Sequence, residues 1–129
     1  MEWLVRGYLV TLGAAGALGV LFYVTVARRY AIAVARGLAT IGWVALLVAY
    51  QRVVAGSPAA AWAVMVLPAT LLLEVLCTAA DFHELDRLPA SGEAERRSRN
   101  RVGIVGGALL LAPAVAMGLV VVMRALARR

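Results

Sequence analysis

An acidic residue, Glu74, stands inside a stretch that is otherwise apolar enough to lie in lipid. A charged group at the bilayer centre costs about 2.5–3.5 kcal/mol by insertion scales, so Glu74 requires compensation. Arg36, a second ionisable residue in an apolar stretch, lies about 9 Å along its helix from Tyr30. Glu74 lies about 10 Å before Asp81, at a depth that matches that of Arg36. The sequence therefore predicts an intramembrane ion pair between Arg36 and Glu74.

The alternative interpretation keeps these two side chains apart. The long aliphatic stem of Arg36 can carry its guanidinium to the nearby interface. Glu74 then remains protonated, as carboxyl groups in apolar surroundings often are. Pairing is the preferred hypothesis because charged groups inside membranes generally pair with one another or face a cavity.

An acid-lined stripe continues from Glu74 along one helical face. After Glu74, the same face carries Cys77 or Thr78, then Asp81, and then Glu84 or Leu85, at helical spacing. A membrane carboxyl beside an acidic vestibule is one way in which a proton or cation path begins. In the other direction, the residues preceding Thr70 include Pro68, Leu67, Val66 and Met65, which continue no polar path. The stripe thus accounts for half of a path at most.

The stretch DFHELD, which begins at Asp81, contains His83, the one histidine of the chain. An HExxH zinc motif requires a second histidine three residues after Glu84, where Arg87 stands instead. No nucleophile–base constellation and no phosphate-binding glycine loop is recognised elsewhere. We therefore expect no catalytic residue, no metal ligand and no cofactor.

The same hydrophilic region is better suited to docking a partner. Its charged residues follow directly on the third apolar stretch and continue in the run EAERRSRNR. Such a run is usually solvated, and it also suits an acidic partner surface or anionic headgroups. The residues that we expect to form this docking surface are Asp81, His83, Glu84, Asp86, Arg87, Arg96 and Arg97.

Composition places the chain in a membrane. Of its 129 residues, 64% are hydrophobic, whereas soluble domains are about 45–50% apolar. The net charge of +6 arises from thirteen arginines without any lysine, a usage typical of a GC-rich genome. These arginines gather at the ends of apolar runs and not on one exposed face, which argues against nucleic-acid binding. The single cysteine excludes an intrachain disulfide.

Four stretches are long enough to cross about 30 Å of hydrocarbon, which takes about 20 helical residues. The predicted fold is an all-α integral membrane bundle of four transmembrane helices, with the third extended beyond the membrane surface. One transmembrane domain covers residues 1–129. The expected helices are 7–26, 31–50, 59–88 and 102–123, with a hydrophilic loop at 89–101.

Small residues provide the expected helix-packing sites. Gly103 and Gly107 form a GxxxG pattern in the fourth stretch, and such patterns allow close approach of helices in lipid. They either pack the bundle itself or form a homodimer face. Pro68 and Pro113 fall inside the third and fourth helices, where each removes a backbone donor.

Orientation follows from the arginine-rich loops. Seven arginines lie in or beside the first and third connections, and five lie towards the other side. The positive-inside rule therefore favours a cytoplasmic position for these two connections, although the basic C-terminus opposes it. We expect a bacterial or archaeal cytoplasmic membrane.

The functional prediction is a non-enzymatic integral membrane subunit of a larger membrane protein complex, serving assembly, anchoring or structural support. The expected partners are the lipid bilayer and other membrane protein subunits, with no nucleic acid. A homo-oligomer is a further possibility. The alternative is a self-assembling small pore, a holin-like protein or a proton- or cation-coupled transporter that uses Glu74. No family signature is recognised in the sequence.

Overall fold

A computed structural model describes residues 2–87 and 92–128, and all of the regular structure in them is helical. The helices are α1 (Glu2–Thr25), α2 (Tyr30–Val54), α3 (Ala63–Arg87) and α4 (Glu93–Leu126). Each is long and apolar enough to cross a membrane. The predicted four-helix membrane fold is thereby confirmed.

Several helix boundaries differ from the expected ones: α1 begins at Glu2 instead of residue 7, and α2 ends at Val54 instead of residue 50. The third helix was expected from residue 59, but α3 begins at Ala63, after a turn in which the Ala63 N–H bonds the Ala60 carbonyl at 3.2 Å. The segment 93–101 was expected as a short charged helix or a mobile segment within the hydrophilic connection, and it forms the first turns of α4, continuous with the membrane segment. Glu93 and Glu95 in the first turn favour a helix N-terminus. Ion pairs at i, i+4 add local support. Residues 88–91 lie outside the described residues.

Helix α2 is the central element of the bundle, because it packs against each of the other three. Two glycines permit the closest approaches. A Cβ on Gly16 of α1 would lie 2.1 Å from Oγ1 of Thr40, and one on Gly42 would lie 2.2 Å from Oγ1 of Thr70 on α3. The apolar core fills the half of the bundle nearer to the chain termini, with Leu46, Leu47, Leu67, Ala114 and Val121 among its buried members.

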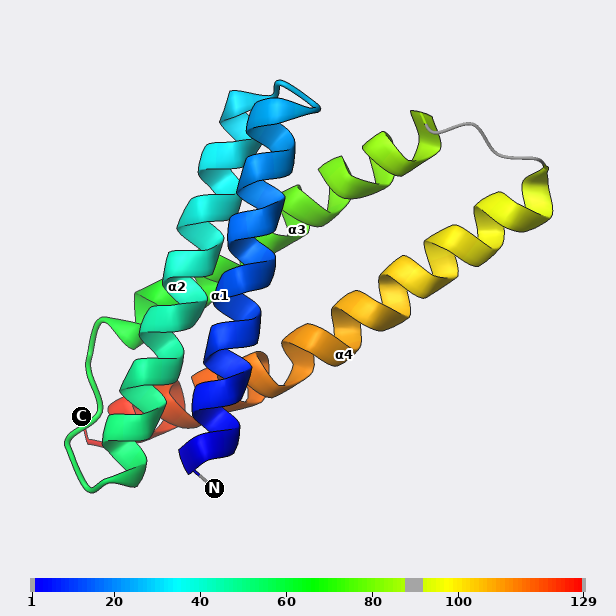
Figure 1. The fold of residues 1–129 in the computed structure, drawn as a ribbon. Coiled ribbons are helices and arrows are strands. Elements are labelled where there is room, and N and C mark those ends of the chain that lie inside the picture. The colour runs from blue at the N-terminus through cyan, green and yellow to red at the C-terminus, as the bar shows by residue number, and fades with distance from the viewer. Residues whose placement is uncertain (1, 88–91, 129) are drawn as a thin grey trace.

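Helices α1 and α4 lie together near the chain termini and diverge towards the other end (Figure 1). One contact between them is a hydrogen bond from the Tyr8 hydroxyl to the Leu110 carbonyl. Pro113 has no N–H, so the carbonyl four residues before it, next to that of Leu110, has no helical donor. Because α1 and α4 diverge, the bundle opens between them in the half that contains Arg36.

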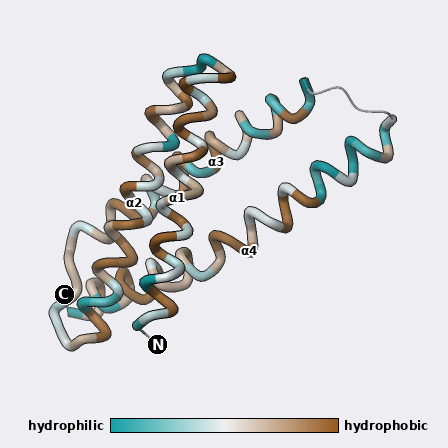
Figure 2. Tube along the Cα trace, in the orientation of Figure 1, coloured by the Kyte–Doolittle hydropathy of each residue, from teal (hydrophilic) through white to brown (hydrophobic). Residues whose placement is uncertain are grey.

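The ends of α3 and α4 extend away from the paired helices α1 and α2, and both are hydrophilic (Figures 1 and 2). With 34 residues, α4 is about 51 Å long, well beyond the thickness of the hydrocarbon core. Arg99 donates a hydrogen bond of 3.4 Å to the Leu85 carbonyl in the last turn of α3. We refer to residues 81–87 and 93–101 together as the arm.

Candidate functional site

The structure brings Arg36 and Glu74 together, at the depth that their positions in the sequence indicate. Nη1 of Arg36 lies 3.2 Å from Oε1 of Glu74, and both side chains are largely buried. Gly19 of α1 makes room for the arginine stem, because a Cβ there would lie 3.3 Å from Cγ of Arg36. Thr40 faces the same region and bonds back to the Arg36 carbonyl at 2.8 Å. The guanidinium is therefore held between α1 and α3.

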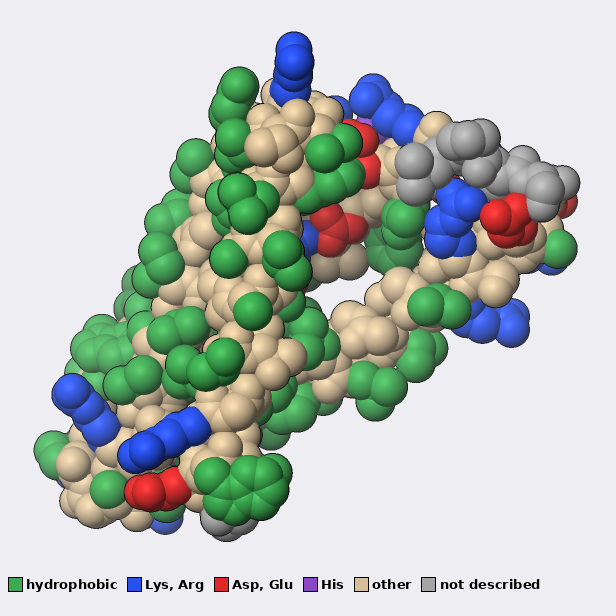
Figure 3. All heavy atoms as spheres, in the orientation of Figure 1, with side chains coloured by type: hydrophobic (Ala, Val, Ile, Leu, Met, Phe, Trp, Pro, Cys, Tyr) green, Lys and Arg blue, Asp and Glu red, His purple; other side chains and the backbone are tan. Residues whose placement is uncertain are grey.

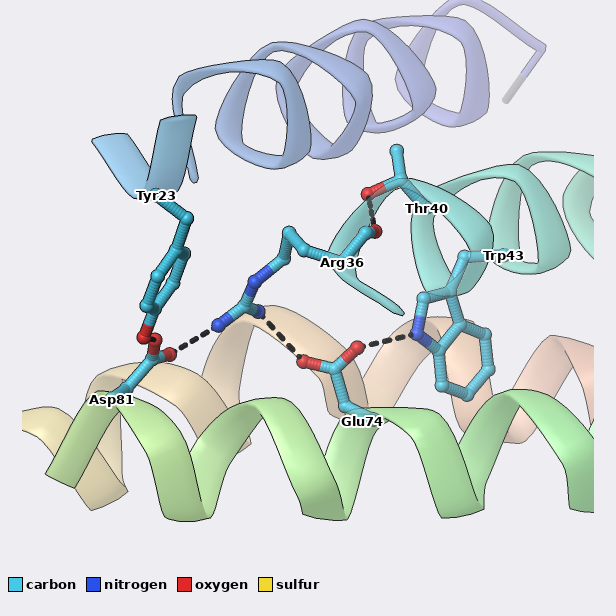
Figure 4. Close-up of polar contacts among 6 residues, drawn as sticks. All are labelled: Tyr23, Arg36, Thr40, Trp43, Glu74 and Asp81. Carbon is cyan, nitrogen blue, oxygen red and sulfur yellow. Dashed lines mark hydrogen bonds and ion pairs between the residues drawn. The ribbon is translucent and has the colours of Figure 1, made fainter. Parts of the chain in front are cut away.

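Asp81 also belongs to this cluster. Its Oδ2 accepts a hydrogen bond from Nη2 of Arg36, and its Oδ1 accepts one from the hydroxyl of Tyr23, which is buried (Figure 4). Asp81 was predicted as part of the docking surface. The structure instead directs its carboxylate at Arg36, because two helical turns separate Asp81 from Glu74 and leave both on one face of α3.

Trp43 completes the cluster at its deeper end. Its indole Nε1–H donates to Oε2 of Glu74 at 3.1 Å, and the ring is buried (Figure 4). A polar ladder thus runs from the loop end of the bundle inwards, in the order Tyr23, Asp81, Arg36, Glu74 and Trp43. It joins α1, α2 and α3 through side chains, and buried polar groups require such partners.

The ladder has one more acidic group than basic groups. With both carboxyls ionised, Arg36 contributes +1 and Glu74 and Asp81 contribute −2, which leaves a net charge of −1. Asp81 carries the more accessible carboxylate, with 43% of its side chain exposed against 14% for Glu74. Both carboxyl groups line the interior opening of the bundle.

A cavity of about 430 Å³ lies beside the ladder. Figure 3 shows the opening, with acidic and basic side chains on one border and α4 on the other. Its polar wall consists of Arg36, Thr40, Trp43, Glu74, Thr78 and Asp81. Apolar and small residues line the rest, including Leu12, Ala15, Phe82, Gly107, Ala108 and Leu111. Ligand sites typically combine such apolar walls with a few convergent polar groups, at about 300–1,000 Å³.

The other predicted docking residues divide into two groups. Glu84 is engaged within the chain, with Oε1 at 3.3 Å from Nη1 of Arg29 and 3.8 Å from Nη1 of Arg87. The others lie on the surface of the arm: His83, Asp86, Arg87, Arg96 and Arg97 are exposed. Arg97 also pairs with Glu93 at 3.5 Å.

The two predicted packing glycines have different surroundings. A Cβ on Gly103 would meet Phe82 and Leu85 of α3 at 3.8 and 3.9 Å, so Gly103 faces a neighbour in its own chain. A Cβ on Gly107 would meet nothing within 4 Å, and this glycine lines the cavity. The tightest helix contacts occur instead at Gly16 and Gly42.

Sequence reasoning missed Tyr23 and Trp43 as members of the site. One signal was present: Arg36 and Trp43 are seven residues apart, as are Glu74 and Asp81, so two antiparallel helices can match them in register. Nothing in the sequence indicates the cavity. Among the described residues, no group of three histidine, cysteine, aspartate or glutamate side chains is arranged to hold a metal ion.

Comparisons with protein-family models, with curated proteins and with solved structures find no match to this chain. Function must therefore be argued from the fold, the ladder, the cavity and the arm.

Proposed function

We propose that this chain is a non-enzymatic integral membrane subunit that docks a partner subunit through its arm. The observation that carries the proposal is the continuation of α4 as a charged helix from Glu93 to the membrane segment, beside the end of α3. In the arm, His83, Asp86, Arg87, Arg96 and Arg97 are exposed. Charged residues displayed on a helical support suit recognition of a complementary surface.

The arm is held together internally and is joined to the rest of the chain. Within it, Arg99 bonds the Leu85 carbonyl. Towards the rest of the chain, Gly103 packs beside Phe82, and Glu84 pairs with Arg29 at the start of α2. A binding surface that is ordered in advance loses less conformational entropy on association. Assembly or anchoring therefore suits this element better than a catalytic role.

The internal pairing of the polar ladder supports the same proposal. Both carboxylates accept hydrogen bonds from side chains on neighbouring helices, which makes the ladder a clamp between α1, α2 and α3. A bundle clamped in this way provides the stable support that an anchoring subunit requires. We further propose that the connection between α1 and α2 and the arm lie on the cytoplasmic side, as the arginine distribution favours.

The test is isolation from source membranes in mild detergent, followed by native electrophoresis and mass spectrometry. We expect the chain to migrate with larger membrane proteins, and the double variant Arg96→Glu/Arg97→Glu to release them. The matched control, Arg124→Glu/Arg128→Glu, changes the same number of charges at the other end of α4. Migration only as the free chain or as its own oligomer contradicts the proposal.

A second candidate is a proton- or cation-coupled transporter or small pore that uses Glu74. The cavity favours it, because Glu74 and Asp81 both line that space. The apolar core weighs against it, because Leu46, Leu67 and Val121 are buried on the side towards the termini and form an apolar layer there. Proton or cation flux in liposomes, abolished in Glu74→Gln, would favour this candidate over the docking subunit.

A further inference from the structure

The geometry points to the cavity as a binding site for a membrane-partitioned organic cation, a monovalent positive group on an apolar body. The cavity shares Asp81, Phe82 and Leu85 with the arm, but not the exposed charged residues through which the proposed subunit would dock. The two proposals therefore rest on different side chains and can fail separately. Three properties of the cavity carry it: the charge of its polar wall, the nature of its other walls and its opening towards the membrane.

The polar wall selects the sign of the ligand charge. Arg36 neutralises one of the two carboxylates, so the ladder retains a charge of −1 when both are ionised. Both carboxylates line the cavity, and that of Asp81 is the more accessible. Charges interact more strongly in an environment of low dielectric constant than in water. The indole N–H of Trp43 donates to Glu74 at the inner end of this wall.

The remaining walls select an apolar body. Leu12, Phe82, Leu85 and Leu111 supply hydrophobic side chains, while Gly107 and Ala108 leave space along α4. Apolar walls do not stabilise a strongly hydrated inorganic cation. They do stabilise an apolar ligand, because its apolar surface is removed from water on binding. The volume lies within the range of small-molecule sites.

The opening lies between α1 and α4, which diverge above their contact at Tyr8 and Leu110 (Figures 1 and 3). Both helices cross the membrane, so a ligand dissolved in the lipid can enter sideways. The ammonium headgroup of a phospholipid shares the required chemistry with a free lipophilic cation. Either source would place its positive group at Asp81.

The primary experiment uses two probes of matched shape and opposite charge, tetraphenylphosphonium and tetraphenylborate. Saturable binding to the detergent-solubilised protein is measured by equilibrium dialysis. A variant that retains Trp43 alone, made by Trp3→Phe and Trp62→Phe, reports occupancy through its fluorescence. We expect the cation to bind at least about tenfold more tightly than the anion. Equal binding of the two ions, or binding of neither, overturns the inference.

Variants then locate the site. Asp81→Asn, which preserves shape and removes the excess charge, should weaken binding of the cation about tenfold. Gly107→Leu should abolish binding by filling the cavity, whereas Gly106→Leu should not, since Gly106 is outside the cavity lining. A Cβ added to either glycine would have no neighbouring atom within 4 Å, so both variants should fold. Equal effects of the two leucines contradict the assignment.

Native mass spectrometry of the protein with its co-purified lipids distinguishes the two ligand sources. The headgroup is the occupant if two results are found together. Tetraphenylphosphonium displaces phosphatidylethanolamine from the wild type, and the Gly107→Leu variant does not retain that lipid. Binding of the phosphonium without loss of lipid identifies a free cation. Both results support the cavity as a cation site, and displacement that is unchanged in Gly107→Leu contradicts it.

Discussion

Arg36 forms more interactions than a simple ion pair requires. It bridges Glu74 and Asp81, which stand two turns apart on α3, and α1 contributes Gly19 beside its stem. Removal of the arginine therefore leaves two carboxylates near each other without a cation. Breaking a buried charge pair on one side generally destabilises more than replacing the whole group by uncharged residues.

We accordingly expect Arg36→Met to destabilise the protein by about 3 kcal/mol, the lower end for a broken buried pair because Asp81 is partly exposed. The triple variant Arg36→Met/Glu74→Gln/Asp81→Asn should be more stable than Arg36→Met, since no unpaired charge remains. Reversible unfolding in mixed micelles provides the measurement. A triple variant whose loss equals the sum of the three single losses would show that these residues act independently.

The indole of Trp43 is the second residue whose role can be isolated. Trp43→Phe removes the donor to Glu74 and some packing volume. In a Glu74→Met background the hydrogen bond is already absent, so Trp43→Phe removes only packing. The loss of stability caused by Trp43→Phe should therefore be smaller in that background by about 0.5–1.5 kcal/mol. Trp62→Phe is the control, because Trp62 is 44% exposed and should change stability by less than about 0.5 kcal/mol. Equal losses in both backgrounds would contradict the hydrogen bond.

Among the elements, α2 determines the spacing of the bundle, and its glycine contacts are the least tolerant of added volume. Gly42 meets Thr70 of α3, a β-branched side chain with little freedom to move away. Gly13 of α1 has open space around it. The same substitution should therefore act in opposite directions at these two helical positions.

Gly42→Ala should destabilise the bundle by about 1–3 kcal/mol through overpacking. Gly13→Ala should be neutral or stabilising by up to about 1 kcal/mol, because alanine is the better helix former. Thermal unfolding in one detergent compares the two variants directly. Equal tolerance at both positions would mean that α2 and α3 are not as close as the structure has them.

For the whole molecule, the antiparallel helices place the arm and the α1–α2 connection at one end and the chain termini at the other (Figure 1). The arm-side end has the larger number of arginines, which favours the cytoplasm for it. The arm-side end has seven arginines and the other end has five, and a labelling experiment decides between the two orientations.

Single cysteines at positions 96 and 128, in a Cys77→Ala background, provide that measurement. Cys77 is the one native cysteine, so its removal leaves the introduced cysteine as the single labelling site. In intact cells, a membrane-impermeant maleimide should label position 128 and should reach position 96 only after permeabilisation. Labelling of position 96 alone in intact cells would reverse the orientation, and labelling of both would indicate two orientations.

The sequence by itself determined the four membrane helices, because the length and apolarity of each are local properties of the chain. It also determined that Arg36 and Glu74 share a depth, since depth follows from helical rise and the short connection between their helices. Tertiary structure decided which way each helix faces. These helices are apolar around most of their circumference, so no hydrophobic stripe indicated their rotation. Packing therefore brought Tyr23 and Trp43 to the ladder and opened the cavity between α1 and α4, whereas Asp81 follows from its helical spacing to Glu74.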